Sequence, residues 1–433
     1  MKNEMKPQTL KGFNDYFSDD MRIRNFIRDS FRDLAQEYGY EPLETPALEY
    51  SDLILGQSGA EAEKLYYKFK DNGDRDVMLK YELMIPMCRA VAQNINNISF
   101  PFKRFQIQNV WRAENVQRGR LREFTQMDID ILGTDSPVAD AEIIQFGLAF
   151  LKKIGLKNFQ VRINSREIIQ GLVEVLNIEK EKFEAVYISI DKLGKIGEEK
   201  VITELTENAK IEKEKVEKLL SILGSNDIEN ISEILSSSKD GVKGLSNVQS
   251  IISILKKAGI EKDFVKFDLS LARGLASYTG AVWEFEIIDG NVGSVSGGGR
   301  YDKAVSKYIG REIPATGTSF GLERLTEIMK DRDIIDDFSK RNSTLIIPLD
   351  ENSLESAFLV ARKLRENNID TTLFPDFLKL KDSLRFADRK GFTWVIIIGE
   401  DEISKNKIQL KNMSNKEQSS IDIESAIKEI LTK

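Results

Sequence analysis

Residues 111–133, WRAENVQRGRLREFTQMDIDILG, decide the predicted fold, because a polar loop joins two strand-like segments there. The run KRFQIQNVWR at residues 103–112 alternates polar and apolar side chains, as does the second half of the 111–133 stretch. Residues i and i+2 of a strand share a face, so Gln126, Asp128 and Asp130 point the same way. The sequence therefore predicts a strand with three polar groups on one face.

Two interpretations of this polar face are open. It is either the water-exposed side of a sheet or the floor of a polar cleft, because buried polar groups need partners. In a cleft, Arg112 and Arg120 would reach a polyphosphate, whose oxygens an arginine fork binds well.

Composition excludes several kinds of chemistry. The net charge is -7, the chain contains no histidine, and Cys88 is its single cysteine. Zinc sites of Cys and His, Ser-His-Asp triads and imidazole bases are thereby excluded. An enzyme with this sequence must use carboxylates, Arg, Lys, backbone dipoles and hard cations such as Mg²⁺. A lone cysteine fits a reducing cytosol, so we expect a cytoplasmic protein, and apolar runs are too short for a membrane span.

The chain divides into three parts. Residues 171–262 are rich in Lys, Glu, Ile and Leu, which predicts a helical insertion. The segments on either side, 1–170 and 263–335, contain strand-like runs and are expected to form one larger domain. Residues 342–433 alternate strands with helices, which predicts a separate α/β domain with a largely parallel sheet.

Two glycine-containing segments are further candidates for a site. In LARGLASYTG, residues 271–280, Arg273 is either a surface residue or a ligand-binding cation. In SGGGRYD, residues 296–302, the three consecutive glycines are either a flexible turn or a place where the backbone packs closely against a ligand.

Two basic features complete the candidates. GTSFGLERL, residues 317–325, places Arg324 near a helix N-terminus, where a phosphate is favoured, although Glu323 and Arg324 could equally be a surface pair. The second feature is a basic stripe of Lys381, Arg385 and Arg389. It is either a solvated helix face or a local RNA-binding surface.

Taken together, these segments resemble the histidyl-tRNA synthetases, a family of class II aminoacyl-tRNA synthetases. The 111–133 stretch is similar to motif 2 of that class, GTSFGLERL to motif 3, and LARGLASYTG to the family's histidine-specific motif. The helix expected at 20–38, with Gly39 to Pro46, resembles motif 1, which forms the family's dimer interface. The resemblance implies an α+β fold, in which helices flank an antiparallel sheet, with a helical insertion and a C-terminal α/β anticodon-binding domain.

The resemblance also implies ATP-dependent activation of histidine and its transfer to the 3′ end of tRNA(His). ATP and Mg²⁺ would be the cofactors, no metal site of the protein's own is expected, and the protein would be a homodimer. The implied catalytic residues are Arg112 and Arg273. The residues implied to bind ATP are Arg112, Glu114, Arg120, Phe124 and Arg324. Those implied to bind the amino acid are Glu82, Met84, Gln126, Asp130, Arg273, Ser277 and Tyr278. Those implied to bind tRNA are Lys381, Arg385 and Arg389.

The chain departs from the family pattern around the expected amino-acid pocket. It has Met84, Ala276 and Ser277 where the family usually has Thr, Asp and Tyr. Loss of these polar groups should weaken discrimination between amino acids. Two alternatives therefore stay open: a paralogue with altered amino-acid specificity, and a non-catalytic synthetase-like protein that binds tRNA or regulates a partner. Retention of the candidate arginines argues against the second.

Overall fold

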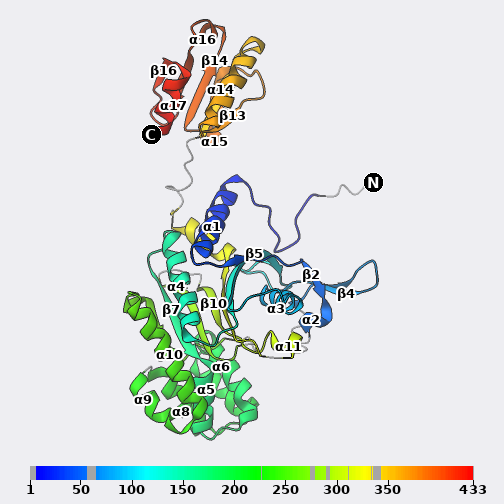
Figure 1. Cartoon of the computed structure of the whole chain (residues 1–433), viewed down its shortest axis with the longest axis vertical. Helices are drawn as coiled ribbons and strands as arrows, with labels where there is room; N and C mark the ends of the chain where they lie inside the picture. The colour runs from blue at the N-terminus through cyan, green and yellow to red at the C-terminus, as the bar shows by residue number, and fades with distance from the viewer. Residues whose placement is uncertain are drawn as a thin grey trace. The chain divides into compact units, whose positions relative to one another are not determined.

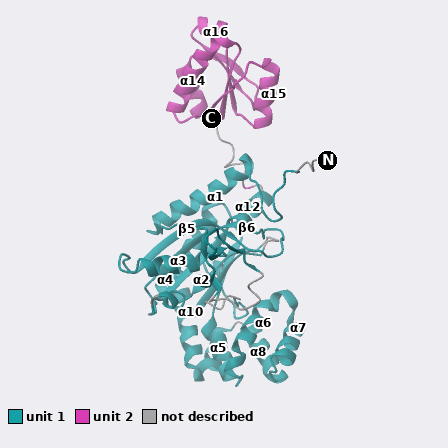
Figure 2. Ribbon diagram, turned by 90° about the vertical axis from the view of Figure 1, so that its right-hand side faces the viewer, with its two compact units in different colours: residues 1–332 teal, residues 333–433 magenta. Residues whose placement is uncertain are grey.

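The computed structural model describes residues 6–55, 65–225, 227–273, 278–288, 293–310, 312–332, 334 and 343–432. The chain forms two compact units, residues 1–332 and residues 333–433, and each is described by itself (Figure 2). Within the described residues, no helix is both long enough and apolar enough to cross a membrane.

The first unit is built on one large sheet with the strand order β1-β5-β6-β11-β10-β9-β7-β8. Neighbouring strands run antiparallel except in the two edge pairs, β1 with β5 and β7 with β8. The predicted α+β fold with an antiparallel sheet is confirmed. The strands are β1 (Glu41–Pro42), β5 (Phe102–Trp111), β6 (Glu123–Leu132), β7 (Phe159–Ser165), β8 (Val265–Phe267), β9 (Ala281–Ile287), β10 (Ser294–Arg300) and β11 (Ala315–Gly321).

Three helices pack against one face of this sheet (Figure 1). They are α1 (Ser18–Glu37), α4 (Pro137–Lys153) and α12 (Leu322–Asp331). The ring of Phe31 meets those of Phe146 and Phe150 edge-on, with centroid separations of 5.2 and 5.1 Å. A Cβ at Gly147 would lie 2.2 Å from the ring of Phe285, so α4 can approach β9 only with glycine there. Phe285 and Phe320 of the sheet pack on this side, and Gln126, Asp128 and Asp130 lie on the opposite face.

A small sheet and three helices lie beside this domain core. The strand order is β2-β4-β3, and both pairs are antiparallel. These elements are β2 (Leu48–Tyr50), α2 (Ser51–Leu55), β3 (Lys68–Lys70), β4 (Asp76–Leu79), α3 (Met84–Gln93) and α11 (Ser306–Ile309).

The described residues between β7 and β8 contain helices and no strand, as the composition predicts. A Cβ at Gly171 would lie 2.5 Å from the backbone of Gly241, so helices α5 and α10 cross in close contact there. Helix α10 also packs on α4 and β7, which ties these helices to the first unit. The domain boundaries at 171 and 262 stay a prediction. The elements are α5 (Arg166–Val175), η2 (Lys180–Lys182), α6 (Phe183–Ile196), α7 (Glu198–Thr203), η3 (Glu204–Asn208), α8 (Lys213–Ser225), α9 (Ile228–Ile234), η4 (Leu235–Ser237), α10 (Lys239–Lys257) and η5 (Lys262–Phe264).

The second unit has a five-stranded sheet in the order β13-β12-β14-β15-β16. The first three of these strands are parallel, as predicted, whereas β15 and β16 pair antiparallel. Separate apolar clusters cover the two faces of this sheet. The elements are β12 (Ser343–Pro348), η6 (Glu351–Ser353), α14 (Leu354–Glu366), β13 (Asp370–Leu373), α15 (Leu380–Lys390), β14 (Trp394–Ile398), α16 (Glu400–Ser404), β15 (Ile408–Asn412), β16 (Gln418–Ile421) and α17 (Ile423–Thr432).

Candidate active site

The polar face of the large sheet is organised in three transverse rows of side chains set by strand register. We call them the outer, middle and inner rows. The outer row is Gln108, Gln126 and Gly321. The middle row is Gln106, Asp128, Ser319, Gly297, Glu284 and Arg162. The inner row is Arg104, Asp130, Gly317, Gly299, Val282 and Asn164.

Accessibility differs between the rows. Ser319, Gly297 and Glu284 of the middle row are partly exposed, whereas Gly317 and Gly299 of the inner row are buried. The surface that a ligand can reach therefore lies over the middle and outer rows. This supports the polar-cleft interpretation of the 111–133 stretch over that of a plain water-exposed sheet.

The three consecutive glycines lie inside strand β10, so the flexible-turn interpretation is wrong. A Cβ at Gly297 would lie 1.7 Å from Arg273 Nη1, and one at Gly299 would lie 2.9 Å from the ring of Tyr278. The close approach is therefore to the protein's own side chains, which lie directly on the strand. Gly317 of β11 has the same relation to Asp130, whose Oδ1 would be 1.9 Å from a Cβ there.

Arg273 lies on the polar face of the sheet and is not a free surface arginine. Its Nη1 donates to Glu284 Oε1 at 2.7 Å, and its backbone N–H donates to Tyr187 Oη at 3.2 Å. The second oxygen of Glu284 accepts from Arg162 at 3.0 Å. Arg273 Nε is buried and has no hydrogen-bond partner among the described residues, so one donor is available to a ligand.

Arg112 lies between two aromatic rings, which hold its guanidinium in place. The guanidinium carbon is 4.3 Å from the ring centroid of Tyr81 and 5.0 Å from that of Phe124. The Tyr81 hydroxyl donates to Glu114 Oε1 at 2.9 Å. Burial raises the pKa of Tyr81 to about 12, so its hydroxyl keeps the proton that it donates.

Four arginines lie close enough to interact electrostatically. Burial lowers the pKa of Arg324, and the positive charges of Arg120, Arg112 and Arg273 lower it further. These four residues come from three separate segments of the chain, and the resemblance implies a catalytic or ATP-binding role for each. Their mutual repulsion is relieved when a polyanion binds between them.

Glu323 does not form a surface pair with Arg324. Its Oε1 accepts from Arg24 Nη1 at 2.9 Å, and both side chains are buried. Its Oε2 accepts from the backbone N–H of Thr125 at 3.0 Å. Glu323 thus connects α12, α1 and β6. Arg324, the next residue of α12, donates from its Nη1 to the carbonyl of Ser294.

The residues expected to bind the amino acid differ from one another in their surroundings. Glu82 caps helix α3, because its two oxygens accept from the backbone N–H groups of Met84 and Ile85 at 2.6 and 2.7 Å. Met84 packs partly buried against the apolar cluster that includes Tyr278. Gln126 Nε2 donates to Ser319 Oγ at 2.8 Å, and its Oε1 is buried without a partner among the described residues. Ser277 and Ala276 lie outside the described residues.

Two carboxylates share one arginine at the inner end. Arg104 Nη2 lies 2.6 Å from Asp130 Oδ2 and 4.0 Å from Asp128 Oδ2. The Tyr301 hydroxyl donates to Asp130 Oδ1. Burial raises the pKa of Asp128 to about 7, and the neighbouring charge of Asp130 adds to this, while Arg104 and the Ser319 hydroxyl oppose it.

Sequence reasoning missed some of these residues. It gave no role to Arg104, Lys80 or Tyr301. Lys80 is buried, its Nζ donates to Gln108 Oε1 at 2.8 Å, and burial lowers its pKa to about 8. The alternation within residues 103–112 was a usable signal for Arg104, since it places that side chain on the same face as Gln108.

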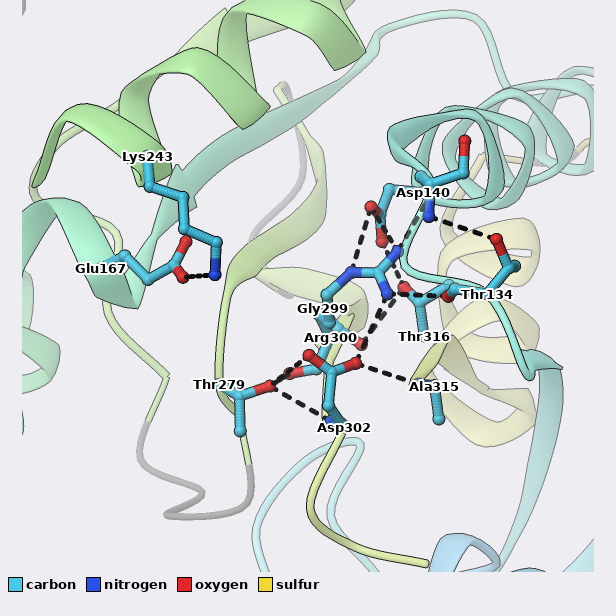
Figure 3. A network of polar contacts seen from close by, with 11 residues as sticks. Thr134, Asp140, Glu167, Lys243, Thr279, Gly299, Arg300, Asp302, Ala315 and Thr316 are labelled. Atoms are coloured by element: carbon cyan, nitrogen blue, oxygen red, sulfur yellow. Dashed lines mark hydrogen bonds and ion pairs between the residues drawn. The ribbon is translucent and has the colours of Figure 1, made fainter. Parts of the chain in front are cut away.

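A buried ion pair fixes the C-terminal end of β10, the strand that contains the three glycines (Figure 3). Arg300 Nη2 lies 2.8 Å from Asp140 Oδ2 of α4, and Arg300 Nη1 donates to the carbonyl of Thr134 at 3.0 Å. Thr316 Oγ1 donates to the second Asp140 oxygen at 2.6 Å. Asp302 Oδ1 accepts from the backbone N–H of Ala315 at 3.0 Å. Strands β10 and β11 are therefore held in register beside the site.

Comparison with known proteins places this arrangement in a family. A sequence profile described as "Histidyl-tRNA synthetase" matches residues 12–325, which contain every site residue discussed above. This chain belongs to the histidyl-tRNA synthetase family. A second profile, described as "Anticodon binding domain", matches residues 343–433, the second unit.

Individual relatives of the histidyl-tRNA synthetase family match nearly end to end. A Histidine--tRNA ligase from Cytophaga hutchinsonii is 34% identical over 454 aligned residues, covering 98% of this chain and 100% of the relative. A Histidine--tRNA ligase from Clostridium tetani is 35% identical, covering 99% of this chain and 98% of the relative. The crystal structure of histidyl-tRNA synthetase from Nostoc sp. PCC 7120 has a TM-score of 0.88 at 26% identity, covering 99% of this chain and 100% of that one.

The glycine contacts generate a prediction about stability. A Cβ at Gly298 would meet the backbone oxygen of Gly317 at 2.3 Å, whereas a Cβ at Gly297 would meet only the end of the Arg273 side chain. Gly298→Ala should therefore lower the free energy of unfolding by about 1–3 kcal/mol or more, and Gly297→Ala by clearly less, as measured by urea titration. Gly321→Ala is the control, because nothing lies within 4 Å of a Cβ there. Equal losses for Gly297→Ala and Gly298→Ala would show that Arg273 cannot move aside.

Proposed function

We propose that this protein activates histidine with ATP and transfers it to the 3′ end of tRNA(His). The observation that supports this best is the electrostatic grouping of Arg112, Arg120, Arg273 and Arg324 in a unit whose sheet also carries buried carboxylates on its polar face. Relatives that match along nearly the whole chain are named Histidine--tRNA ligase. Retention of Arg112, Arg273 and Arg324 argues against the non-catalytic alternative.

The first chemical step is attack of the histidine carboxylate on the α-phosphate of ATP, which forms the adenylate and releases pyrophosphate. Negative charge gathers at the α-phosphate in the transition state, and fixed cations lower its energy. We assign this stabilisation to Arg112 and Arg273. Arg120 and Arg324 would hold the outer phosphates, and Phe124 with Glu114 would position the adenine.

No general base is required for this step, because the substrate carboxylate is already ionised at neutral pH. A chain without histidine can therefore perform it. The described residues hold no group of three or more Asp, Glu, Cys or His that could bind a metal ion. Mg²⁺ would accordingly be bound chiefly through phosphate oxygens of ATP, and it would supply neutralisation of their charge.

The second unit would hold the tRNA through helix α15. Lys381, Arg385 and Arg389 are exposed and spaced so that they share one face of this helix. Within the described part of this helix, Arg385 forms an ion pair with Asp382 at 3.5 Å. A stripe of this kind gives a net-acidic protein a local surface for the phosphate backbone.

We include a homodimer and a cytoplasmic location in the proposal. The small sheet exposes Leu48, Tyr50 and Phe69, and Tyr50 and Phe69 flank the same residue of β4, so they share a face. An apolar face of this kind is typical of a subunit interface. Cys88 is a buried free thiol, which is typical of a protein from a reducing compartment.

Aminoacylation is the direct test of the proposed function. Purified protein with ATP, Mg²⁺ and radiolabelled histidine should form acid-precipitable histidyl-tRNA on a tRNA(His) transcript and not on a transcript of unrelated identity. The reaction should require ATP, because the adenylate is the activated intermediate. Folded protein that forms no histidyl-tRNA under these conditions would contradict the proposal.

The role of α15 has its own test. Replacing Lys381, Arg385 and Arg389 together by Ala should raise the KM for tRNA and reduce the slope of log affinity against log salt by about two to three. Histidine-dependent ATP–pyrophosphate exchange should stay unchanged, because the exchange site lies in the first unit.

The matched control removes three basic residues from α14 of the same unit, namely Arg362, Lys363 and Arg365. These residues are also exposed. The control variant also removes three positive charges, so the net charge of the protein changes equally. If the control raises the KM for tRNA as much as the α15 variant does, the effect is one of overall charge and the assignment to α15 is wrong.

A further inference from the structure

We propose that Tyr187, which belongs to the helices between β7 and β8, is a positioning residue for adenylate formation, because it fixes the backbone of Arg273. The helical insertion thereby takes part in the first chemical step. This inference rests on the proposed function, since it assumes that Arg273 stabilises charge at the α-phosphate. It assigns a role to a residue that the sequence pattern did not single out.

Arg273 lies in the connection between two strands and not in a strand. β8 ends at Phe267 and β9 begins at Ala281. The carbonyl of Leu271 accepts from Asn164 Nδ2 at 2.9 Å. Two residues later, the backbone N–H of Arg273 donates to Tyr187 Oη at 3.2 Å. The position of the connection at Arg273 therefore depends on a side chain from another part of the chain.

Tyr187 can anchor this connection, because its own side chain is held firmly. It lies on helix α6, and only 1% of it is exposed. Its ring centroid is 4.4 Å from the guanidinium carbon of Arg166 and 5.7 Å from the ring centroid of Phe183. Arg166 follows directly after β7, and its backbone N–H donates to the carbonyl of Gly280, just before β9, at 2.9 Å. Tyr187 is thus tied to the large sheet.

Helix α6 presents a second group to Arg273. Asp191 lies one turn after Tyr187, and residues four apart share a helix face. Burial alone would lower the pKa of Arg273, but the pKa is raised. Tyr278, Glu284 and Asp191, in this order, favour the charged guanidinium. One face of α6 therefore holds the backbone of Arg273 with an acceptor and attracts its guanidinium with a carboxylate.

The side chain of Arg273 must be placed accurately. Its Nη1 donates to Glu284 Oε1 at 2.7 Å, its guanidinium occupies the space above Gly297, and its Nε has no partner among the described residues. A shift of the backbone moves the end of this long side chain away from these contacts. Misplacement of a catalytic group by about 1 Å can lower a rate by about 100-fold. The contact at the Arg273 N–H therefore affects the rate of the chemical step.

The main test removes the hydroxyl of Tyr187. Tyr187→Phe keeps the ring and its packing but leaves the Arg273 N–H without its acceptor. In histidine-dependent ATP–pyrophosphate exchange, kcat should fall by about 10- to 100-fold. The KM for ATP should not change, because Arg120 and Arg324 would hold the outer phosphates, and the loss of an interaction made in the transition state lowers kcat.

The matched control is Ser189→Ala. Ser189 carries a buried hydroxyl on the same helix, two residues after Tyr187, so it lies on a different face of α6. This variant should keep the wild-type kcat, with circular dichroism and thermal unfolding recorded for both variants. If Tyr187→Phe does not fold, Asp191→Asn takes its place, and it should also lower kcat without changing the KM for ATP.

A double-variant comparison separates positioning from a general structural role. Arg273→Lys keeps a cation but loses the planar fork that the contacts of Arg273 orient. In this background Tyr187→Phe should lower single-turnover adenylate formation by a clearly smaller factor than in the wild type, because the positioned group has changed. A role confined to the stability of helix α6 would lower the rate by the same factor in both backgrounds.

The outcomes are distinct. A wild-type kcat in folded Tyr187→Phe, or in Asp191→Asn where that variant replaces it, would overturn the proposal. So would an equal fall in Ser189→Ala, or an equal factor in the Arg273→Lys background. Wild-type protein that shows no histidine-dependent exchange would instead contradict the proposed function itself.

Discussion

The site depends on one steric constraint, which is that side chains lie directly on the backbone of strands β10 and β11. The guanidinium of Arg273 occupies the space where Gly297 would have a Cβ, and the carboxylate of Asp130 occupies that of Gly317. Any larger residue at these positions would displace the charged group above it. The glycines therefore leave the space above β10 and β11 in which Arg273 and Asp130 are positioned.

The charged groups above these glycines are arranged for a ligand, and they destabilise the protein when no ligand is bound. The arginines around Arg324 repel one another, and Asp128 has an oxygen without a partner among the described residues. Other buried charges of the same unit form ion pairs, as with Arg300 and Asp140 or Arg24 and Glu323. Mutually repelling or unpartnered charged groups that gather on one face are typical of a binding site.

Much of the fold and part of the site could be predicted from local pattern. Alternation along 111–133 correctly placed Gln126, Asp128 and Asp130 on one face, because the period of a strand depends only on neighbouring residues. Contacts between distant segments could not be predicted in this way. The partner of Glu323 is Arg24, roughly 300 positions earlier in the chain, and nothing near either residue indicates the pairing. The three glycines were equally ambiguous, since their role depends on Arg273 and Tyr278, which approach from a different segment.

The central claim is that this polar face binds histidine and ATP for adenylate formation. The most direct measurement is ATP–pyrophosphate exchange by the wild-type protein with each of the standard amino acids supplied singly. The account predicts exchange with histidine and background rates with the others. Faster exchange with a different amino acid would contradict the assigned selectivity. Absence of exchange with every amino acid, in protein shown to be folded, would contradict the catalytic role.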